Sequence, residues 1–459
     1  MEDHDGLQKE RNEAKALNDD SGLNTAHRID HDPWLQVGLL LVTGYNCGYI
    51  VSFSNLILKP LGWTWGLIAM VFIAILSLYA NWLLAGFHII DGQRFIRYRD
   101  LMGCLFGKKI HHMTWALQVL NLLFANMGFI LLAGNSLKES YISPSFSLYS
   151  LCEIFPLEIH AAFTSSPLRL QDYIIISGVI CFLFAFIVPN MSSMGAWFAL
   201  SGFFTLIYVV TIIAVSIKDG KSNIKKDYSV SRSNVEKVFN AFNAISAILF
   251  TNTSGMLPEI QCTLHKPAVK NMRKALYLQF TLGLGIYYVI TIIGYWAYGS
   301  HVSEYLPDQF SGPKWASIIA NSAIFFQTII SQNVFCSPIH EALDTRFLRL
   351  DQSLYSLDNV KRRLLLRGGL FLLNTFIAAM FPFLGDFVNL VGSFSLFPLT
   401  FIFPSMIFIK VQGRKANSAV KAWHWLNIIG FSFVTLVTTI AALRLIVQNA
   451  KLYHLFADT

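Results

Sequence analysis

The chain has 459 residues, of which 54% are hydrophobic and only 14% are charged, and its mean hydropathy is +0.50. Soluble domains carry about 25% charged residues, so this composition excludes an ordinary soluble enzyme or binding domain. Because the apolar residues fall into long blocks, we predict an all-α polytopic protein of the lipid bilayer. The net charge of +8 comes mainly from short loops between these blocks, where Lys and Arg report membrane orientation rather than binding to nucleic acid.

The N-terminal segment, residues 1–33, is polar, rich in acidic residues and free of any apolar run. This composition is typical of a disordered tail, and we place it in the cytosol. It lacks the apolar core of a cleavable signal peptide. The first membrane helix is therefore expected to direct insertion by itself.

Eleven apolar segments follow and give a transmembrane domain over residues 34–448. They are expected at 34–58, 63–87, 112–137, 171–189, 194–216, 239–259, 276–297, 315–338, 364–382, 386–409 and 422–448. With the N-terminus inside, most Lys and Arg of the loops lie on the inner side; the loop from Lys218 to Lys237 is an exception. An odd number of helices then leaves residues 449–459 as a short extracellular C-terminus.

The first segment is interrupted in its middle by Gly44, Tyr45, Asn46, Cys47 and Gly48. Glycines and polar residues disfavour a straight helix. An unwound backbone is tolerated in lipid only where protein buries it or where it lines a cavity. One interpretation is therefore a broken helix that holds a solute. The alternative is a close helix–helix contact, because the spacing Gly44-x-x-x-Gly48 also fits that motif.

The sixth segment has a matching interruption at Thr251, Asn252, Thr253, Ser254 and Gly255. Paired broken helices at equivalent places in two halves indicate the central site of a transporter. Because five segments separate the two interruptions, the halves have opposite orientations. We therefore predict a leucine-transporter-like 5+5 inverted repeat, with repeats at about 34–216 and 239–409 and an added helix at 422–448. This repeat favours the solute site over the simple helix contact.

The backbone at such interruptions can bind a zwitterion, because helix N-termini attract carboxylates and free carbonyls accept hydrogen bonds from an ammonium. The residues predicted to contact the solute are Gly44, Tyr45, Asn46, Cys47, Gly48 and Tyr49 in the first segment and Thr251, Asn252, Thr253 and Ser254 in the sixth. Glu259 is the acidic residue near the interruptions, so it is the candidate for proton coupling. It could instead be an end cap or a partner for loop lysines.

Signatures of an enzyme or of a metal centre are missing from the sequence. The six cysteines are scattered with no CxxC pair, and His27 and His31 have no neighbours that would complete a metal site. The Gly103–Lys109 stretch lacks the spacing and the Ser or Thr of a phosphate loop. We predict no enzymatic activity, no cofactor and no metal.

Several stretches carry a family resemblance, most specifically in the first third of the chain. They are HDPWLQVG at 31–38, GYNCGYIVSFSN at 44–55, LGWTWG at 61–66, YANWLL at 79–84, DGQRFIRYRDL at 91–101 and EIQCTL at 259–264. Together they resemble the plant proline (compatible-solute) transporters of the amino acid/auxin permease family. The resemblance covers nearly the whole chain from His31 onward.

The resemblance implies proton-coupled import of proline at the plasma membrane, with glycine betaine and 4-aminobutyrate (GABA) as further substrates. Aromatic side chains would suit a methylated ammonium by cation–π attraction, and Tyr45 and Tyr49 are the nearest ones to the first interruption. The loop Tyr141–Ser166 departs from the family pattern, since it is longer than the usual connection. The alternatives are a general amino-acid or auxin carrier of the same family and a membrane receptor that senses a solute without moving it. The sequence does not fix the oligomeric state.

Overall fold

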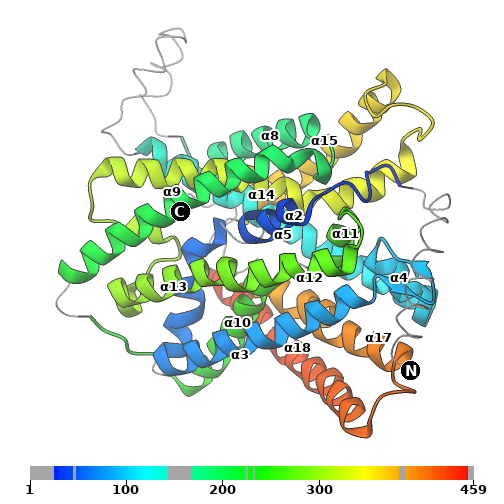
Figure 1. Cartoon of the computed structure of the whole chain (residues 1–459). Helices are drawn as coiled ribbons and strands as arrows, with labels where there is room; N and C mark the ends of the chain where they lie inside the picture. The colour runs from blue at the N-terminus through cyan, green and yellow to red at the C-terminus, as the bar shows by residue number, and fades with distance from the viewer. Residues whose placement is uncertain are drawn as a thin grey trace.

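The computed structural model of the protein describes residues 25–44, 48–142, 168–222, 226–230, 233–253, 255–381 and 389–452. Within these ranges the chain is almost entirely helical, apart from the short antiparallel hairpin of β1 (Ile89–Ile90) and β2 (Gln93–Arg94). Figure 1 shows most of the long helices running side by side. Parts of the predictions lie outside the described residues: Tyr45, Asn46, Cys47, Ser254, residues 1–24 and 453–459, and the loop Tyr141–Ser166 beyond the end of α5.

The helices of the first half are α2 (Trp34–Leu39), η2 (Leu40–Gly44), η3 (Gly48–Ser52), η4 (Ser54–Leu58), α3 (Lys59–Gly86), α4 (Tyr98–Phe106), α5 (Lys108–Ile142), α8 (Leu170–Ile187), η5 (Met191–Met194) and α9 (Gly195–Ser222). Those of the second half are α10 (Asn234–Asn252), α11 (Leu257–Gln261), α12 (Ala268–Leu278), η6 (Gln279–Gly283), α13 (Leu284–Tyr298), η7 (Gly299–His301), η8 (Leu306–Gln309), α14 (Lys314–Phe347), α15 (Leu357–Met380), η9 (Gly392–Leu396), η10 (Pro398–Ile402), α17 (Phe403–Val411) and α18 (Ser418–Leu452). Here α marks α-helices, and η marks 3-10 or π-helical turns.

Ten helical stretches in the described ranges are long and apolar enough to cross a membrane. The predicted sixth segment, 239–259, is not one of the ten, because it is divided between α10 and the five-residue α11. The eleven predicted segments therefore correspond to these ten stretches and the divided α10–α11 pair.

The predicted boundary between the first two segments falls at Gly62. The turn η4 runs into the first residues of α3, but Gly62 has non-helical dihedrals, with φ 69° and ψ −177°. Glycine adopts such a positive φ without strain. The helix is interrupted there and resumes after Gly62, where the second segment was expected to begin.

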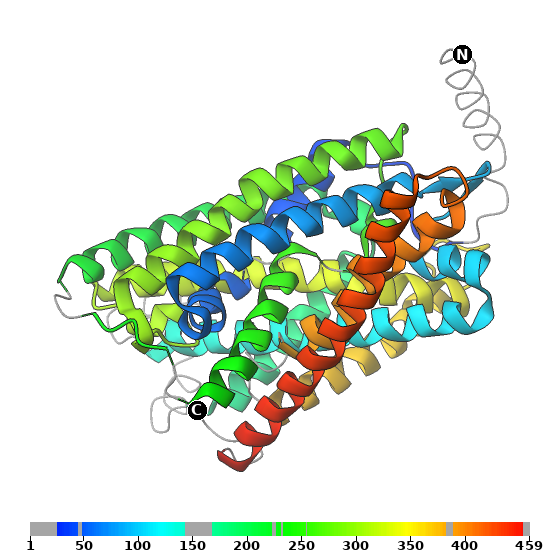
Figure 2. The same ribbon diagram turned by 90° about the horizontal axis from the view of Figure 1, so that it is seen from below.

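The helices α5 and α14 form the centre of the bundle. They pack against each other, and α14 is buried along most of its length. The C-terminal α18 lies at the periphery beside α17, crossing the outside of the molecule in Figure 2, and exposes apolar side chains such as Ile429 and Phe433. Apolar exposure of this kind suits a surface in contact with lipid. The two central helices carry the polar side chains that contact both interruptions.

Candidate functional site

The first interruption joins helical turns of different types. The segment passes from α2 into the π-helical η2, which ends at Gly44, and resumes as the 3-10 turn η3 at Gly48. The carbonyl oxygen of Thr43 accepts a hydrogen bond from Nε2 of Gln327 on α14 at 2.6 Å. A change of helix type in the middle of a segment often marks a functional site. The helix is thus irregular where the sequence predicts an interruption.

The second interruption is a true break in the helix. The α10 helix ends at Asn252, and Thr253 is extended with φ −154° and ψ 157°. Gly255 then has a positive φ of 69°, which glycine adopts without strain, before α11 starts at Leu257. The predicted interruption of the sixth segment is observed at this place.

Aromatic side chains connect the two interruptions. The ring centroid of Tyr49 lies 5.1 Å from that of Phe250, at the end of α10, and 4.9 Å from that of Phe129 on α5. Phe129 in turn lies 5.0 Å from Phe335 on α14. All four side chains are buried. The two broken segments therefore meet at one aromatic cluster, which we define as Tyr49, Phe129, Phe250 and Phe335.

The other predicted contact residues that the structure describes lie around this cluster. The hydroxyl of Thr251 donates to the carbonyl oxygen of Ile248 and to Oδ1 of Asn252. The carbonyl oxygen of Asn252 accepts from Nε2 of Gln279 at 3.3 Å. Thr251, Asn252 and Thr253 are all buried. They remain candidate solute contacts.

Glu259 lies just beyond the second break and is bound to it through Gln118 of α5. Its Oε1 accepts from the backbone N–H of Tyr98 at 2.9 Å and from Nε2 of Gln118 at 3.1 Å. The same Nε2 donates to the carbonyl oxygen of Gly255 at 3.0 Å. Oε2 of Glu259 is buried and has no hydrogen-bond partner among the described residues. A movement at the break would therefore alter the surroundings of this carboxyl group.

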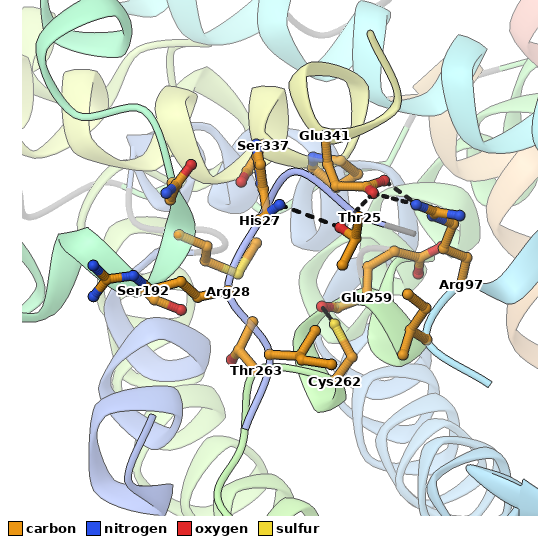
Figure 3. Close-up of a pocket in the computed structure, with 15 residues that line it drawn as sticks. Thr25, His27, Arg28, Arg97, Ser192, Glu259, Cys262, Thr263, Ser337 and Glu341 are labelled. Carbon is orange, nitrogen blue, oxygen red and sulfur yellow. Dashed lines mark hydrogen bonds and ion pairs between the residues drawn. The ribbon is translucent and has the colours of Figure 1, made fainter. Parts of the chain in front are cut away.

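A small pocket separates Glu259 from the N-terminal segment 25–32, which we name the strap. Its volume is about 40 Å³. This is space for a few water molecules but not for an amino acid. Figure 3 shows side chains of the strap, of α11 with its following loop and of α14 converging around the pocket. Side chains of the strap and the side chain of Glu259 therefore line the same pocket.

The strap is an ordered segment, although residues 1–33 were all predicted as a disordered tail. Its backbone hydrogen-bonds with the loop that follows α11. The bonds are Asp30 N–H to Cys262 O at 3.1 Å, His31 N–H to Thr263 O at 2.8 Å, Asp32 N–H to Thr263 O at 2.7 Å and His265 N–H to Asp32 O at 2.9 Å. The strap is thus paired with this loop through backbone hydrogen bonds beside the pocket.

Arg94, on the hairpin, fixes the middle of the strap. Its two terminal nitrogens donate to the two carboxylate oxygens of Asp30 at 2.6 and 2.7 Å, a bidentate pair. Its Nε donates to Nε2 of His88 at 3.0 Å. Burial, together with the charge of Arg94, lowers the pKa of His88 to about 3, so this imidazole stays neutral and can accept that bond.

The start of the strap is attached to α14. The hydroxyl of Thr25 donates to Oε1 of Glu341 at 2.9 Å, and Nε of Arg97 donates to Oε2 of the same carboxylate at 3.1 Å. A second contact with α14 lies next to this one: Nε2 of His27 is 3.3 Å from Oδ2 of Asp344. The strap therefore connects α14 to the hairpin and to the loop after α11. Sequence reasoning missed these residues, since each bond joins segments far apart in the chain.

Release of the strap can be detected through the thiol of Cys262, which lines the pocket. Burial raises the pKa of this thiol above its usual range, and only the thiolate reacts rapidly with maleimides. We expect Asp30→Asn, which loses the charged bidentate pair with Arg94, to speed maleimide labelling of Cys262 by about tenfold. Mass spectrometry of the labelled peptides gives the rate at each cysteine.

The matched control for this prediction is Asp91→Asn. Asp91 is an exposed acid in the turn of the same hairpin and makes no hydrogen bond or ion pair with the strap among the described residues. Its labelling rate should equal that of the unaltered protein. An unchanged rate in Asp30→Asn as well would show that the Asp30–Arg94 pair does not keep the pocket closed.

Comparison with known proteins assigns this architecture. The family described as "Transmembrane amino acid transporter protein" matches residues 31–445. GABA transporter 1 of Arabidopsis thaliana is 26% identical over 442 residues, covering 93% of each chain. Lysine histidine transporter-like 6 of the same plant is 25% identical over 407 residues, covering 86% of this chain and 87% of its own.

A solved structure shares the fold. The crystal structure of MhsT in complex with L-phenylalanine superposes with a TM-score of 0.53 at 11% identity, covering 94% of this chain and 98% of that one. The predicted leucine-transporter-like fold is therefore confirmed. Because the family match extends over most of the sequence, the chain belongs to the transmembrane amino acid transporter protein family and is a multi-pass membrane protein that transports amino acids.

Proposed function

We propose that the protein is a secondary active, proton-coupled importer of proline and of the related solutes glycine betaine and GABA, located in the plasma membrane. The observation that carries the proposal is the meeting of two interrupted helices at one buried aromatic cluster. Compact zwitterions suit such a place, because backbone groups can bind both charges and aromatic rings attract a substituted ammonium. The likeness to GABA transporter 1 supports this substrate class.

The proposed contacts are those predicted from the sequence. They are Gly44, Tyr45, Asn46, Cys47, Gly48 and Tyr49 at the first interruption, and Thr251, Asn252, Thr253 and Ser254 at the second. Transport would proceed by alternating access, in which one group of helices moves around the bound solute. The strap would form the cytosolic closure, with the N-terminus in the cytosol.

Protons would supply the energy through Glu259. One charge that crosses 100 mV is worth about 2.3 kcal/mol, and one pH unit adds about 1.4 kcal/mol. Together these support accumulation of a net-neutral solute by several hundredfold. The bonds from Tyr98 and Gln118 place the carboxyl group beside the second break, where binding and proton transfer can be coupled.

A second candidate is a general amino-acid carrier of the same family. The likeness to lysine histidine transporter-like 6 favours it. The two candidates differ in the side-chain charge that they accept, because a site for proline or GABA has no need to bind a cationic side chain. Competition by lysine and histidine therefore separates them from each other.

The test is uptake of labelled proline into a yeast strain that lacks its own proline permeases, at pH 5 and pH 7.5. We expect saturable accumulation that is larger at pH 5 and is inhibited by excess betaine or GABA but not by lysine. Inhibition by lysine or histidine would favour the general carrier instead. Absence of proline uptake, with the protein shown at the cell surface, would overturn the proposed substrate class.

A further inference from the structure

The first interruption is bound by the side chain of Gln327 from α14. Its Nε2 lies 2.6 Å from the carbonyl oxygen of Thr43, 2.6 Å from Oγ of Ser331 and 3.4 Å from Oγ of Ser201 on α9. All four residues are buried. Three neutral oxygens, from the interrupted segment and from two other helices, therefore converge on one nitrogen atom.

The chemistry of these partners fixes the orientation of the amide. A backbone carbonyl oxygen only accepts hydrogen bonds, so the atom 2.6 Å from the Thr43 oxygen has to be the donor nitrogen of Gln327. The amide oxygen Oε1 points elsewhere, and it is buried without a hydrogen-bond partner among the described residues. The site thus uses the electropositive end of the amide and leaves the other end unpaired.

A cluster of neutral oxygens around one point is also the environment that a small hard cation requires. In transporters with broken helices, carbonyls freed at the break are where coupling cations bind. In this protein the partly positive N–H groups of Gln327 occupy that position and donate to these oxygens. A metal ion could reach the same oxygens only by displacing the amide.

The second break is also bound by the side-chain nitrogen of a glutamine. Gln118 of α5 directs its Nε2 to the carbonyl oxygen of Gly255 at 3.0 Å, and its own Oε1 is likewise unpaired among the described residues. One difference separates the two sites. Gln118 also binds the titratable carboxyl group of Glu259, whereas the partners of Gln327 described above are all neutral. Among the described residues, the partners of Gln327 at the first site therefore include no carboxyl group that would respond to a proton.

We propose that Gln327 is a positioning residue whose amide nitrogen holds the first interruption in the place of a metal cation, so that the protein binds no sodium ion there. The proposal deepens the proposed function, since it makes the first interruption independent of metal ions and leaves proton coupling to the second. A variant without this nitrogen should expose the oxygens to a cation. A variant with a carboxylate there should complete a cation site.

The experiment measures thermal unfolding of the purified full chain in NaCl and in choline chloride at equal ionic strength and alkaline pH. Wild type should show equal melting temperatures in the two salts. Sodium should raise the melting temperature of Gln327→Glu, and to a smaller extent that of Gln327→Ala, by about 2 °C at a concentration tenfold above the dissociation constant. Gln327→Ala is the smaller change and covers the case in which the buried carboxylate prevents folding.

The matched control is Gln332→Glu. Gln332 lies on the same helix and is equally buried, but its Nε2 donates to side chains, including Oδ1 of Asn126 at 3.1 Å, rather than to a carbonyl at an interruption. This variant should show no difference between sodium and choline. A sodium-specific rise in wild type, or in the control to the same extent as in Gln327→Glu, would overturn the proposal. The proposal would also be overturned if sodium raised the melting temperature of neither Gln327 variant.

Transport gives a second readout that a merely structural role would not change. Wild-type uptake should be equal in the two salts, whereas uptake by Gln327→Ala should fall by about tenfold in choline and recover in part in sodium. Failure of wild type to take up proline would count against the proposed substrate alone, because the melting experiment needs no substrate. A lack of sodium response with intact proline uptake would count against the role of Gln327 alone.

Discussion

Glu259→Gln is expected to abolish proton-driven accumulation of the solute while exchange of bound solute continues. Glutamine has nearly the same shape, and its amide oxygen can still accept the N–H of Tyr98, but it cannot take up or release a proton. In proteoliposomes with an imposed pH gradient, net uptake should fall by about a hundredfold, to the level set by facilitated diffusion. Exchange of labelled for unlabelled solute should stay within about twofold, since exchange needs no net proton movement.

The control for this prediction is Glu236→Gln, which removes an exposed acid from the first turn of α10, at the opposite end of that helix from the break. It should leave both activities unchanged. Wild-type accumulation in Glu259→Gln would end the role of this residue in coupling. Equal loss of accumulation and exchange would show that Glu259 supports the structure of the second break and not the proton step.

The interruptions could be predicted because their signals are local. A break needs residues that weaken a helix within one segment, and Gly44, Gly48 and the Thr251–Gly255 stretch supply them. The matching positions in two halves then predicted the repeat. Conversely, Gln118 and Gln327 looked like any polar residue in an apolar helix. Their roles depend on which helix faces the break, and that information is not contained in the helix itself.

The strap illustrates the opposite case. Its composition is that of a disordered segment, because it has few apolar residues to bury. Its order comes from partners that are distant in the sequence, such as Arg94 for Asp30 and Glu341 for Thr25. A charged pair of this kind stabilises a segment only after the rest of the chain has brought its partners together. Local composition predicted disorder for all of residues 1–33 and could not predict that the strap docks.

Arg367→Met is expected to destabilise the protein more than any other single charge removal at this end of the bundle. Arg367 and Asp344 have side chains that are each 1% exposed, and Nη2 of Arg367 donates to Oδ2 of Asp344 at 2.6 Å. Removing Arg367 leaves the buried Asp344 carboxylate without its permanently charged partner, although His27 stays beside it, and the loss of one partner of a buried pair costs about 3–5 kcal/mol. The melting temperature in detergent should fall by about 5 °C or more.

Arg363→Met provides the control, because Arg363 is also buried and binds the end of α8, donating to Phe186 O at 2.6 Å, but makes no ion pair among the described residues. Its loss should cost about 1–2 kcal/mol, the value of the hydrogen bonds alone.

The double variant Arg367→Met with Asp344→Leu should regain much of the stability lost in Arg367→Met, since apolar residues often replace a buried ion pair without loss. If the double variant melts no higher than Arg367→Met, the cost lies in the uncapped carbonyls of Ala185 and Pro189 instead of the stranded carboxylate. The pair would then serve to end α8, and His27 of the strap would be bound to a carboxylate that the fold does not depend on.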